Sequence, residues 1–180
     1  MMIGTIKKLI EDTLFAVGMD VEIKHEQCGI NMSYNFILHY IGFDANRIQV
    51  ALRDTKPAVT LEQYVKAFTL HELGHALDRD ALFGSLTRTM EIYEMKRGYS
   101  KEQRYSNPEL LALLLEEHAM NLEFEETAWN NAKKLNRMYR IVEWNVFEQI
   151  KRHGLMTYQQ AYQKDVNIYE QLLSAQSDIA

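Results

Sequence analysis

His71-Glu72-Leu73-Gly74-His75 is the stretch from which the rest of the chain is interpreted. In an α-helix, side chains four residues apart lie on the same face, so the two imidazoles can reach one metal ion. The glutamate directly after the first histidine can hold a water molecule beside that ion. Two histidines on one helical turn are half of a tetrahedral zinc site, which a third protein ligand and a water would complete.

The sequence around this motif predicts the helix that the motif needs. Thr60 and Gln63 have the spacing of a capping box, which begins a helix. Apolar residues then recur at helical spacing as far as Phe83, without a proline. Residues 68–71 and 73–77 carry no Asp, Glu, Lys or Arg, as expected for a helix that runs through a core.

The motif resembles that of the HExxH zincin metallopeptidases, whose third ligand is a histidine soon after the motif or a glutamate on a later helix. No histidine follows His75 until His118, which disfavours the histidine type. Residues 125–129 resemble the Glu-x-x-Ala pattern of gluzincins, and with Ala132 they resemble the longer form of the ImmA/IrrE family and related phage-like zinc peptidases. The chain departs from that family in a longer interval between the two segments and in Trp129 after the alanine.

A long helix without glycine or proline is predicted at residues 109–135, and it offers the third ligand. One stripe of this helix is mostly apolar and steps by three or four residues: Leu111, Leu115, His118, Leu122, Glu125, Trp129 and Ala132. Glu125 is the only carboxylate on it, and a metal ion would remove the cost of burying that charge. We therefore favour Glu125 as the ligand. Glu116, which begins a second Glu-x-x-Ala match, remains an alternative, and His118 is a third candidate or a supporting group.

Several other residues are candidates for supporting roles. Asp78 lies three residues after His75 and could accept the second ring N–H of a ligand histidine, or it could be a solvated residue near a helix end. The C-terminal tyrosines could include a phenol that stabilises an oxyanion, but core or surface packing is the favoured explanation for any one of them. These tyrosines are Tyr139, Tyr158, Tyr162 and Tyr169.

The predicted fold class is α+β, mostly α. A first helix is expected at residues 3–17, followed by an antiparallel meander of three strands joined by short turns. The strands are expected at residues 21–27, 35–40 and 47–53, with a turn at 42–46. Further helices are expected at residues 87–97, 109–135, 138–153 and 157–173, with Gly84, Gly98 and Gly154 as breaks. A loop that could contain a short helical turn is expected at 99–108.

The zincin resemblance implies a particular organisation of these elements. A small sheet would precede the metal helix within a zincin-like domain at residues 1–136, and residues 137–180 would add C-terminal helices packed on the same domain. In that family an edge strand borders the cleft and pairs with an extended peptide substrate. The strand expected at residues 47–53 is a candidate for this edge.

Length, charge and cysteine content restrict the class of protein. A chain of 180 residues fits one domain, and its net charge of −5 disfavours direct binding of nucleic acid. A single cysteine, Cys28, excludes an intrachain disulfide and fits a reducing compartment. Residues 1–19 include charges that interrupt a secretory signal, and no run is long enough to span a membrane. The expected location is cytoplasmic.

These features lead to the expectation of a zinc metallopeptidase. His71, His75 and Glu125 would bind Zn²⁺, and Glu72 would act as general base in the hydrolysis of a peptide or protein substrate. The family resemblance adds a repressor-like regulator as one candidate substrate. The alternative is a zinc-binding regulatory or protein-interaction module without proteolytic turnover. The sequence leaves the oligomeric state open.

Overall fold

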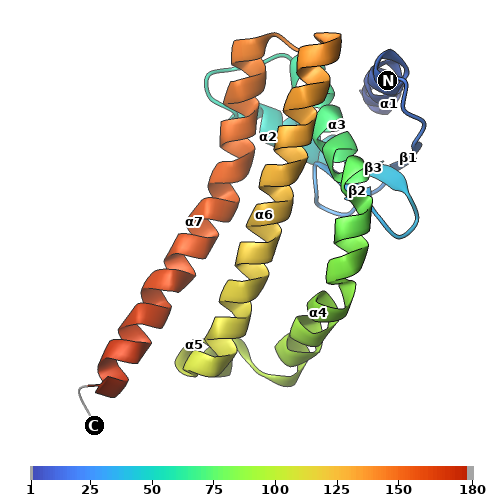
Figure 1. The fold of residues 1–180 in the computed structure, drawn as a ribbon. Helices are drawn as coiled ribbons and strands as arrows, with labels where there is room; N and C mark the ends of the chain where they lie inside the picture. The colour runs from blue at the N-terminus through green and yellow to red at the C-terminus, as the bar shows by residue number, and fades with distance from the viewer. Residues whose placement is uncertain (1, 178–180) are drawn as a thin grey trace.

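The computed structural model describes residues 2–177, in which a mostly helical chain carries one small sheet (Figure 1). The chain begins with α1 (Met2–Val17), β1 (Glu22–His25), β2 (Met32–Asn35) and β3 (Tyr40–Phe43). It continues through α2 (Ala45–Asp54), α3 (Leu61–Leu77), α4 (Arg79–Gly98), α5 (Lys101–Ser106), α6 (Pro108–Tyr139) and α7 (Trp144–Ser177). The predicted class, α+β and mostly α, is confirmed at this level.

The sheet is mixed, so the predicted antiparallel meander is wrong. Its order is β1-β3-β2, in which β1 runs parallel to β3 and β2 runs antiparallel to it. The third strand returns between the first two because it carries the most apolar residues. Ile41 and Phe43 of β3 are fully buried, whereas β1 has exposed residues at both ends. Consecutive strands are therefore not neighbours throughout the sheet.

The strand expected at residues 35–40 and the turn expected at 42–46 were placed wrongly. β2 ends at Asn35, whose side-chain oxygen accepts a hydrogen bond from the backbone N–H of Leu38 and so makes a turn. The chain then re-enters the sheet as β3.

The strand expected at residues 47–53 is also wrong, because this segment is the helix α2. The side chain of Asp44 caps it by accepting hydrogen bonds from the N–H groups of Asn46 and Arg47. Ala45 and Ile48, three residues apart, point into the core together. The apolar residues of this segment fit a helical period as well as an alternating one, and the cap decides between them.

Two glycines that were expected to break helices lie inside them. The helix predicted from Thr60 with its capping box is confirmed as α3, but it ends at Leu77, and α4 begins directly after Asp78. Gly84 lies within α4, so the first break falls earlier than expected. Gly154 lies within α7, which runs without interruption where two helices were expected at 138–153 and 157–173.

The boundary between α6 and α7 also differs from the expectation. α6 continues to Tyr139 and ends at Arg140, which has a left-handed backbone conformation. The side chain of Asn136 holds the following turn, since it both donates to and accepts from the backbone of Val142. The segment expected to be a loop at residues 99–108 contains the short helix α5.

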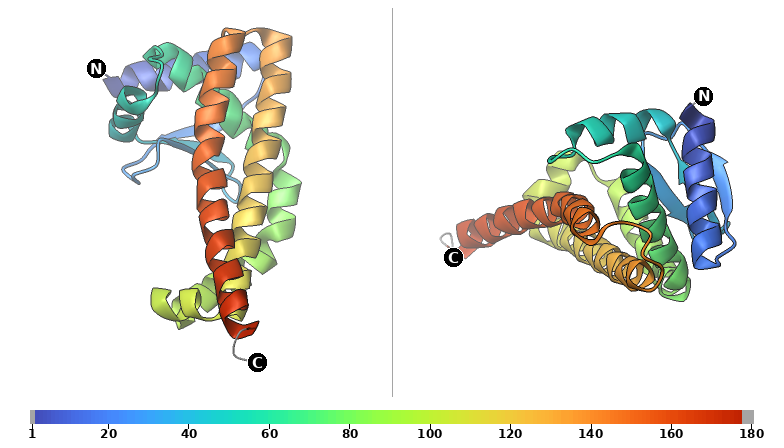
Figure 2. Two further views of the ribbon diagram at one scale, coloured as in Figure 1. Left: turned by 90° about the vertical axis from the view of Figure 1, so that its left-hand side faces the viewer. Right: turned by 90° about the horizontal axis from the view of Figure 1, so that it is seen from above.

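Helices α3, α6 and α7 run side by side, and α1 and the sheet lie on the other side of α3 (Figures 1 and 2). One hydrophobic cluster joins all of these elements. It includes Ile10 of α1, Ile41 of β3, Leu73 of α3, Trp129 of α6 and Phe147 of α7. The C-terminal helix therefore shares its core with the N-terminal part of the chain. No helix within residues 2–177 is both long and apolar enough to cross a bilayer.

Candidate metal centre

The site is built on a very close contact between α3 and α6. A Cβ atom added to Gly74 would lie 2.0 Å from the carbonyl oxygen of Ala128, so only glycine fits at this point of α3. Asn131 reinforces the contact by donating a hydrogen bond from its side-chain amide to the carbonyl of Gly74, at 3.2 Å. This close packing brings the face of α3 that carries His71 and His75 against α6.

Glu125 of α6 meets both histidines at this contact. Its carboxylate oxygens lie 3.1 Å from His71 Nε2 and 3.4 Å from His75 Nε2. The three ligand atoms lie within 4.8 Å of one another, and the three side chains are largely shielded from solvent. The structure thus brings together the three residues that the sequence analysis selected as metal ligands.

The charges of this group depend on one another. Burial raises the pKa of the Glu125 carboxyl, but hydrogen bonds and charges from His71 and His75 outweigh it and hold that pKa far below its usual range. Burial lowers the pKa of His75, whereas Glu125, Glu72 and Asp78 raise it, and the net pKa is above the ordinary value. The carboxylate is thus kept ionised, which is the form that binds a metal ion.

The donor set and its spacing fit zinc. Two imidazoles and one carboxylate are the ligand set of many zinc hydrolases. Bonds of about 2.0–2.1 Å at tetrahedral angles place ligand atoms about 3.3 Å apart, close to the separations of Glu125 from His71 and His75.

Trp129 supports the site from behind. Its ring stacks on His71 with centroids 4.3 Å apart and also contacts Phe68 and Phe147. A Cβ on Gly154 would lie 3.1 Å from the Trp129 ring, tighter than an ordinary contact, so the glycine eases the close approach of α7 to this ring. The tryptophan that departs from the family pattern therefore fixes the plane of one proposed ligand.

Glu72 is almost fully buried beside the two histidines. Burial raises the pKa of its carboxyl, and the charges of His71 and His75 oppose this only in part. The backbone N–H of Tyr34 on β2 also lowers this pKa, to a smaller extent than the histidines do. A buried carboxyl with increased proton affinity suits a group that must accept a proton.

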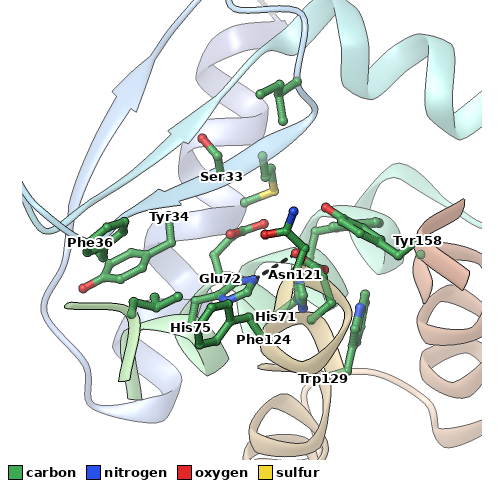
Figure 3. A pocket seen from close by; sticks show the side chains of 16 residues that line it. Ser33, Tyr34, Phe36, His71, Glu72, His75, Asn121, Phe124, Trp129 and Tyr158 are labelled. Atoms are coloured by element: carbon green, nitrogen blue, oxygen red, sulfur yellow. Dashed lines mark ion pairs between the residues drawn. The ribbon is translucent and has the colours of Figure 1, made fainter. Parts of the chain in front are cut away.

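These residues open onto a cavity of about 340 Å³ between β2 on one side and α6 and α7 on the other (Figure 3). Tyr34 and Tyr158 approach it from opposite sides, and Glu72 and Asn121 point into it (Figure 3). Much of the remaining wall is apolar, including Met32, Phe36, Phe68, Leu82 and Phe124. The cavity can therefore accept an apolar side chain next to the two histidines.

The edge strand at this cavity is β2, because it lies at one margin of the sheet. The carbonyl of Asn31 accepts a hydrogen bond from Asp44 on the β3 side. Since backbone groups alternate along a strand, those of Met32 and Tyr34 face away from β3, toward the cavity. Arg79 fixes the end of this edge by donating from Nε to the carbonyl of Phe36 at 2.7 Å. The candidate edge at residues 47–53 is not a strand at all.

The alternative ligands lie elsewhere. Glu116 accepts two hydrogen bonds of 2.6 Å from Arg88 of α4. His118 pairs with Asp165 of α7 at 3.1 Å. Neither belongs to the group formed with His71 and His75 within the described residues.

Asp78 lies at the junction of α3 and α4, and its charge raises the pKa of His75. Within residues 2–177, Asp78 forms the expected hydrogen bond with neither His75 nor His71, and the buried Nδ1 of His71 has no partner there.

Of the candidate tyrosines, Tyr158 lines the cavity. Burial raises the pKa of its phenol, and the charge of the nearby Glu125 carboxylate raises that pKa further. Tyr139, Tyr162 and Tyr169 are not among the residues that line the cavity in the described part of the chain. Asn121 was missed, although its position four residues before Glu125 indicates the same face of α6. The sequence did not indicate that Tyr34 lines the cavity, because the strand that contains it was expected at residues 35–40.

Comparisons with models of protein families, with curated proteins and with solved structures found no match to this chain. Any function assigned to this chain therefore depends on its residues and their geometry alone.

Proposed function

We propose that this protein is a zinc-dependent metallopeptidase with a zincin-like catalytic domain. The observation that carries the proposal is the convergence of His71, His75 and Glu125, from two helices, beside the buried carboxyl of Glu72. The open cavity and the free edge of β2 at the same place provide room for a peptide. Zinc held by the three ligands would supply Lewis acidity, which makes water a nucleophile near neutral pH and polarises a carbonyl group.

The protein's own residues would perform the remaining steps. The N–H and C=O of Met32 and the C=O of Tyr34, which face outward from β2, bind the substrate as an extended strand. Glu72 removes a proton from the attacking water, whose oxygen bonds to the scissile carbonyl carbon. As the C–N bond breaks, Glu72 returns that proton to the leaving nitrogen. The phenol of Tyr158 donates a hydrogen bond to the oxyanion that forms between these steps.

The substrate is proposed to be a peptide or protein with an apolar side chain close to the scissile bond. The lining of the cavity supports this choice, because Met32, Phe68 and Phe124 contribute apolar surface beside the histidines. A repressor-like regulator, suggested by the resemblance to the ImmA/IrrE family, is one candidate to add to purified protein.

Metal analysis and peptide hydrolysis test this proposal. Purified wild-type protein should contain about one zinc per chain, Glu125→Ala should lose it, and Glu116→Ala is the matched control that should keep it. Glu72→Gln should retain the metal and lose hydrolysis of a mixed peptide library. Full activity of Glu72→Gln would refute the mechanism. Stoichiometric zinc with an intact bound partner and no cleavage would favour the non-catalytic binding module instead.

A further inference from the structure

The margin of the sheet opposite to the cavity is formed by β1, which has one neighbour, β3, within the described residues. The N–H of Glu26 donates to the carbonyl of Phe43, which lies on the β3 side of the strand. Because backbone groups alternate, those of Glu22 and Lys24 also face β3, and those of Ile23 and His25 face outward. This margin therefore offers hydrogen-bonding groups to another strand.

The sequence of β1 is complementary to itself in the antiparallel direction. If two copies meet with Ile23 opposite Ile23, each isoleucine directs its outward N–H and C=O at the other, which is the hydrogen-bonded pair of an antiparallel ladder. In the same register Glu22 of each copy lies opposite Lys24 of the other. Glu22 and Lys24 lie on the same face of β1, as their ion pair at 3.3 Å within one chain demonstrates.

An apolar groove accompanies this margin. A cavity of about 690 Å³ lies between α1 and β1, and its lining includes Leu14, Phe15, Met19 and Ile23. Phe15 is 90% exposed, the largest exposed fraction among the large apolar side chains of the described residues. This ring supplies apolar surface beside the open strand that a partner strand can cover. Figure 1 shows that α1 and β1 lie on the side of α3 away from α6 and α7.

We propose that the chain forms a homodimer in which β1 pairs antiparallel with β1 of a second copy, centred on Ile23. The two three-stranded sheets then become one sheet of six strands, and the groove beside Phe15 is covered. A second copy is the occupant that the charges select, because one twofold axis satisfies both Glu22–Lys24 pairs at once. The cavity beside β2 lies at the opposite margin and stays open in this dimer.

Charge exchange across the two-fold axis tests this register. Sedimentation velocity of the wild-type chain should show a monomer–dimer equilibrium. Glu22→Lys and Lys24→Glu each place like charges opposite one another, so each should weaken self-association by about tenfold or more. An equimolar mixture of these two variants should recover the dimer, since every Lys then faces a Glu. Lys8→Glu, on α1 outside the groove, changes the net charge equally and should leave the dimer intact.

A third variant tests the apolar part of the interface without affecting the charges. Phe15→Ser should also weaken the dimer, while the melting temperature of the monomer and its metal content stay unchanged, because this side chain makes no contribution to the core. A wild-type chain that stays monomeric at every concentration would overturn the proposal. So would a dimer that both charge variants leave unchanged, or a mixture that fails to recover association.

Discussion

Two glutamates on α6 show how position along one helix changes what a carboxylate does. Glu125 has a side chain that is 15% exposed and lies against His71 and His75 of α3. Glu116, nine residues earlier, has a side chain that is 41% exposed and is held by Arg88 of α4. Both carboxyl groups have a lowered pKa. Arg88 is the main cause for Glu116, whereas for Glu125 the two histidines overcome an opposing effect of burial.

The difference comes from the helices that pack on α6, because the two glutamates are chemically the same. α4 presents Arg88 and Lys96, which form ion pairs with Glu116 and Glu117 near the surface. Such pairs contribute little to stability. Near the middle of α6, α3 presents two imidazoles in a shielded place, where a bound metal ion would stabilise the buried carboxylate. The part of α6 around Glu116 is thus a partly exposed support, and the part around Glu125 is a candidate metal centre.

The largest difference between Glu125 and Glu116 is expected in the effect of zinc on stability. If zinc binds only the folded protein, a thousandfold excess over its Kd raises the free energy of unfolding by about 4 kcal/mol. The melting temperature of wild type should therefore fall after removal of metal with a chelator and recover when zinc is added. Glu116→Ala should behave as wild type does, and Glu125→Ala should not respond. An equal response of Glu125→Ala would place the metal elsewhere.

The contact between α3 and α6 gives the next largest effect. Gly74→Ala places a methyl group against the Ala128 carbonyl and forces the helices apart, so it should lower the free energy of unfolding by about 3 kcal/mol. Gly84→Ala is the control, since it lies on the exposed side of α4 with open space around it. There alanine should raise the stability by about 1 kcal/mol. Denaturant unfolding measures both values, and effects of the same sign would contradict the packing argument.

A buried carboxylate at the far end of the helices tests whether that region is also held by specific contacts. Asp165 of α7 accepts hydrogen bonds from Tyr105 at 2.8 Å and from His118 at 3.1 Å. Asp165→Ala should cost about 2 kcal/mol in chemical denaturation. It should leave the zinc content unchanged, because His118 lies outside the metal group. Asp12→Ala, on the exposed face of α1, should change stability by less than about 0.5 kcal/mol. Loss of zinc from Asp165→Ala would show that the contacts of Asp165 and the metal group are coupled.

The smallest effect is expected from the pH dependence of Glu116. Arg88 holds the pKa of this carboxyl below its ordinary value of 4.5 in the folded protein. The ion pair therefore contributes stability above pH 4.5, and this stability is lost as the pH falls through the lowered pKa. Thermal melts of wild type and Glu116→Gln should differ slightly at neutral pH and converge in acid. A difference in melting temperature that grows as the pH falls would contradict this prediction.

The sequence predicted the helical elements of the site because their signals are local. The capping box at Thr60 begins α3, and the spacing of His71 and His75 places both on one face. The apolar stripe on residues 109–135 favoured Glu125 over Glu116. In the structure Leu111, Trp129 and Ala132 of that stripe are fully buried, so the stripe faces the core. Periodicity thus indicated which carboxylate turns inward, without reference to the partner helix.

The sheet and two helix boundaries could not be predicted in this way. Ile48 and its apolar neighbours fit either a strand or a helix, and a side chain outside the segment, Asp44, decided for the helix. Gly154 suggested a helix end, yet it serves to let α7 approach the ring of Trp129. The position of β3 between β1 and β2 depends on which strand the core buries, and no single stretch of sequence contains that information.

The sequence by itself determined that two histidines and a glutamate occupy the inner faces of two separate helices, because helical periodicity is a property of neighbouring residues. Only the tertiary structure decided that these faces meet at Gly74 and Ala128, that Tyr34 and Tyr158 border the same cavity, and that β2 and β1 form the two margins of the sheet. Those arrangements depend on packing between segments far apart in the chain, where shape and burial of the whole core select one partner among many.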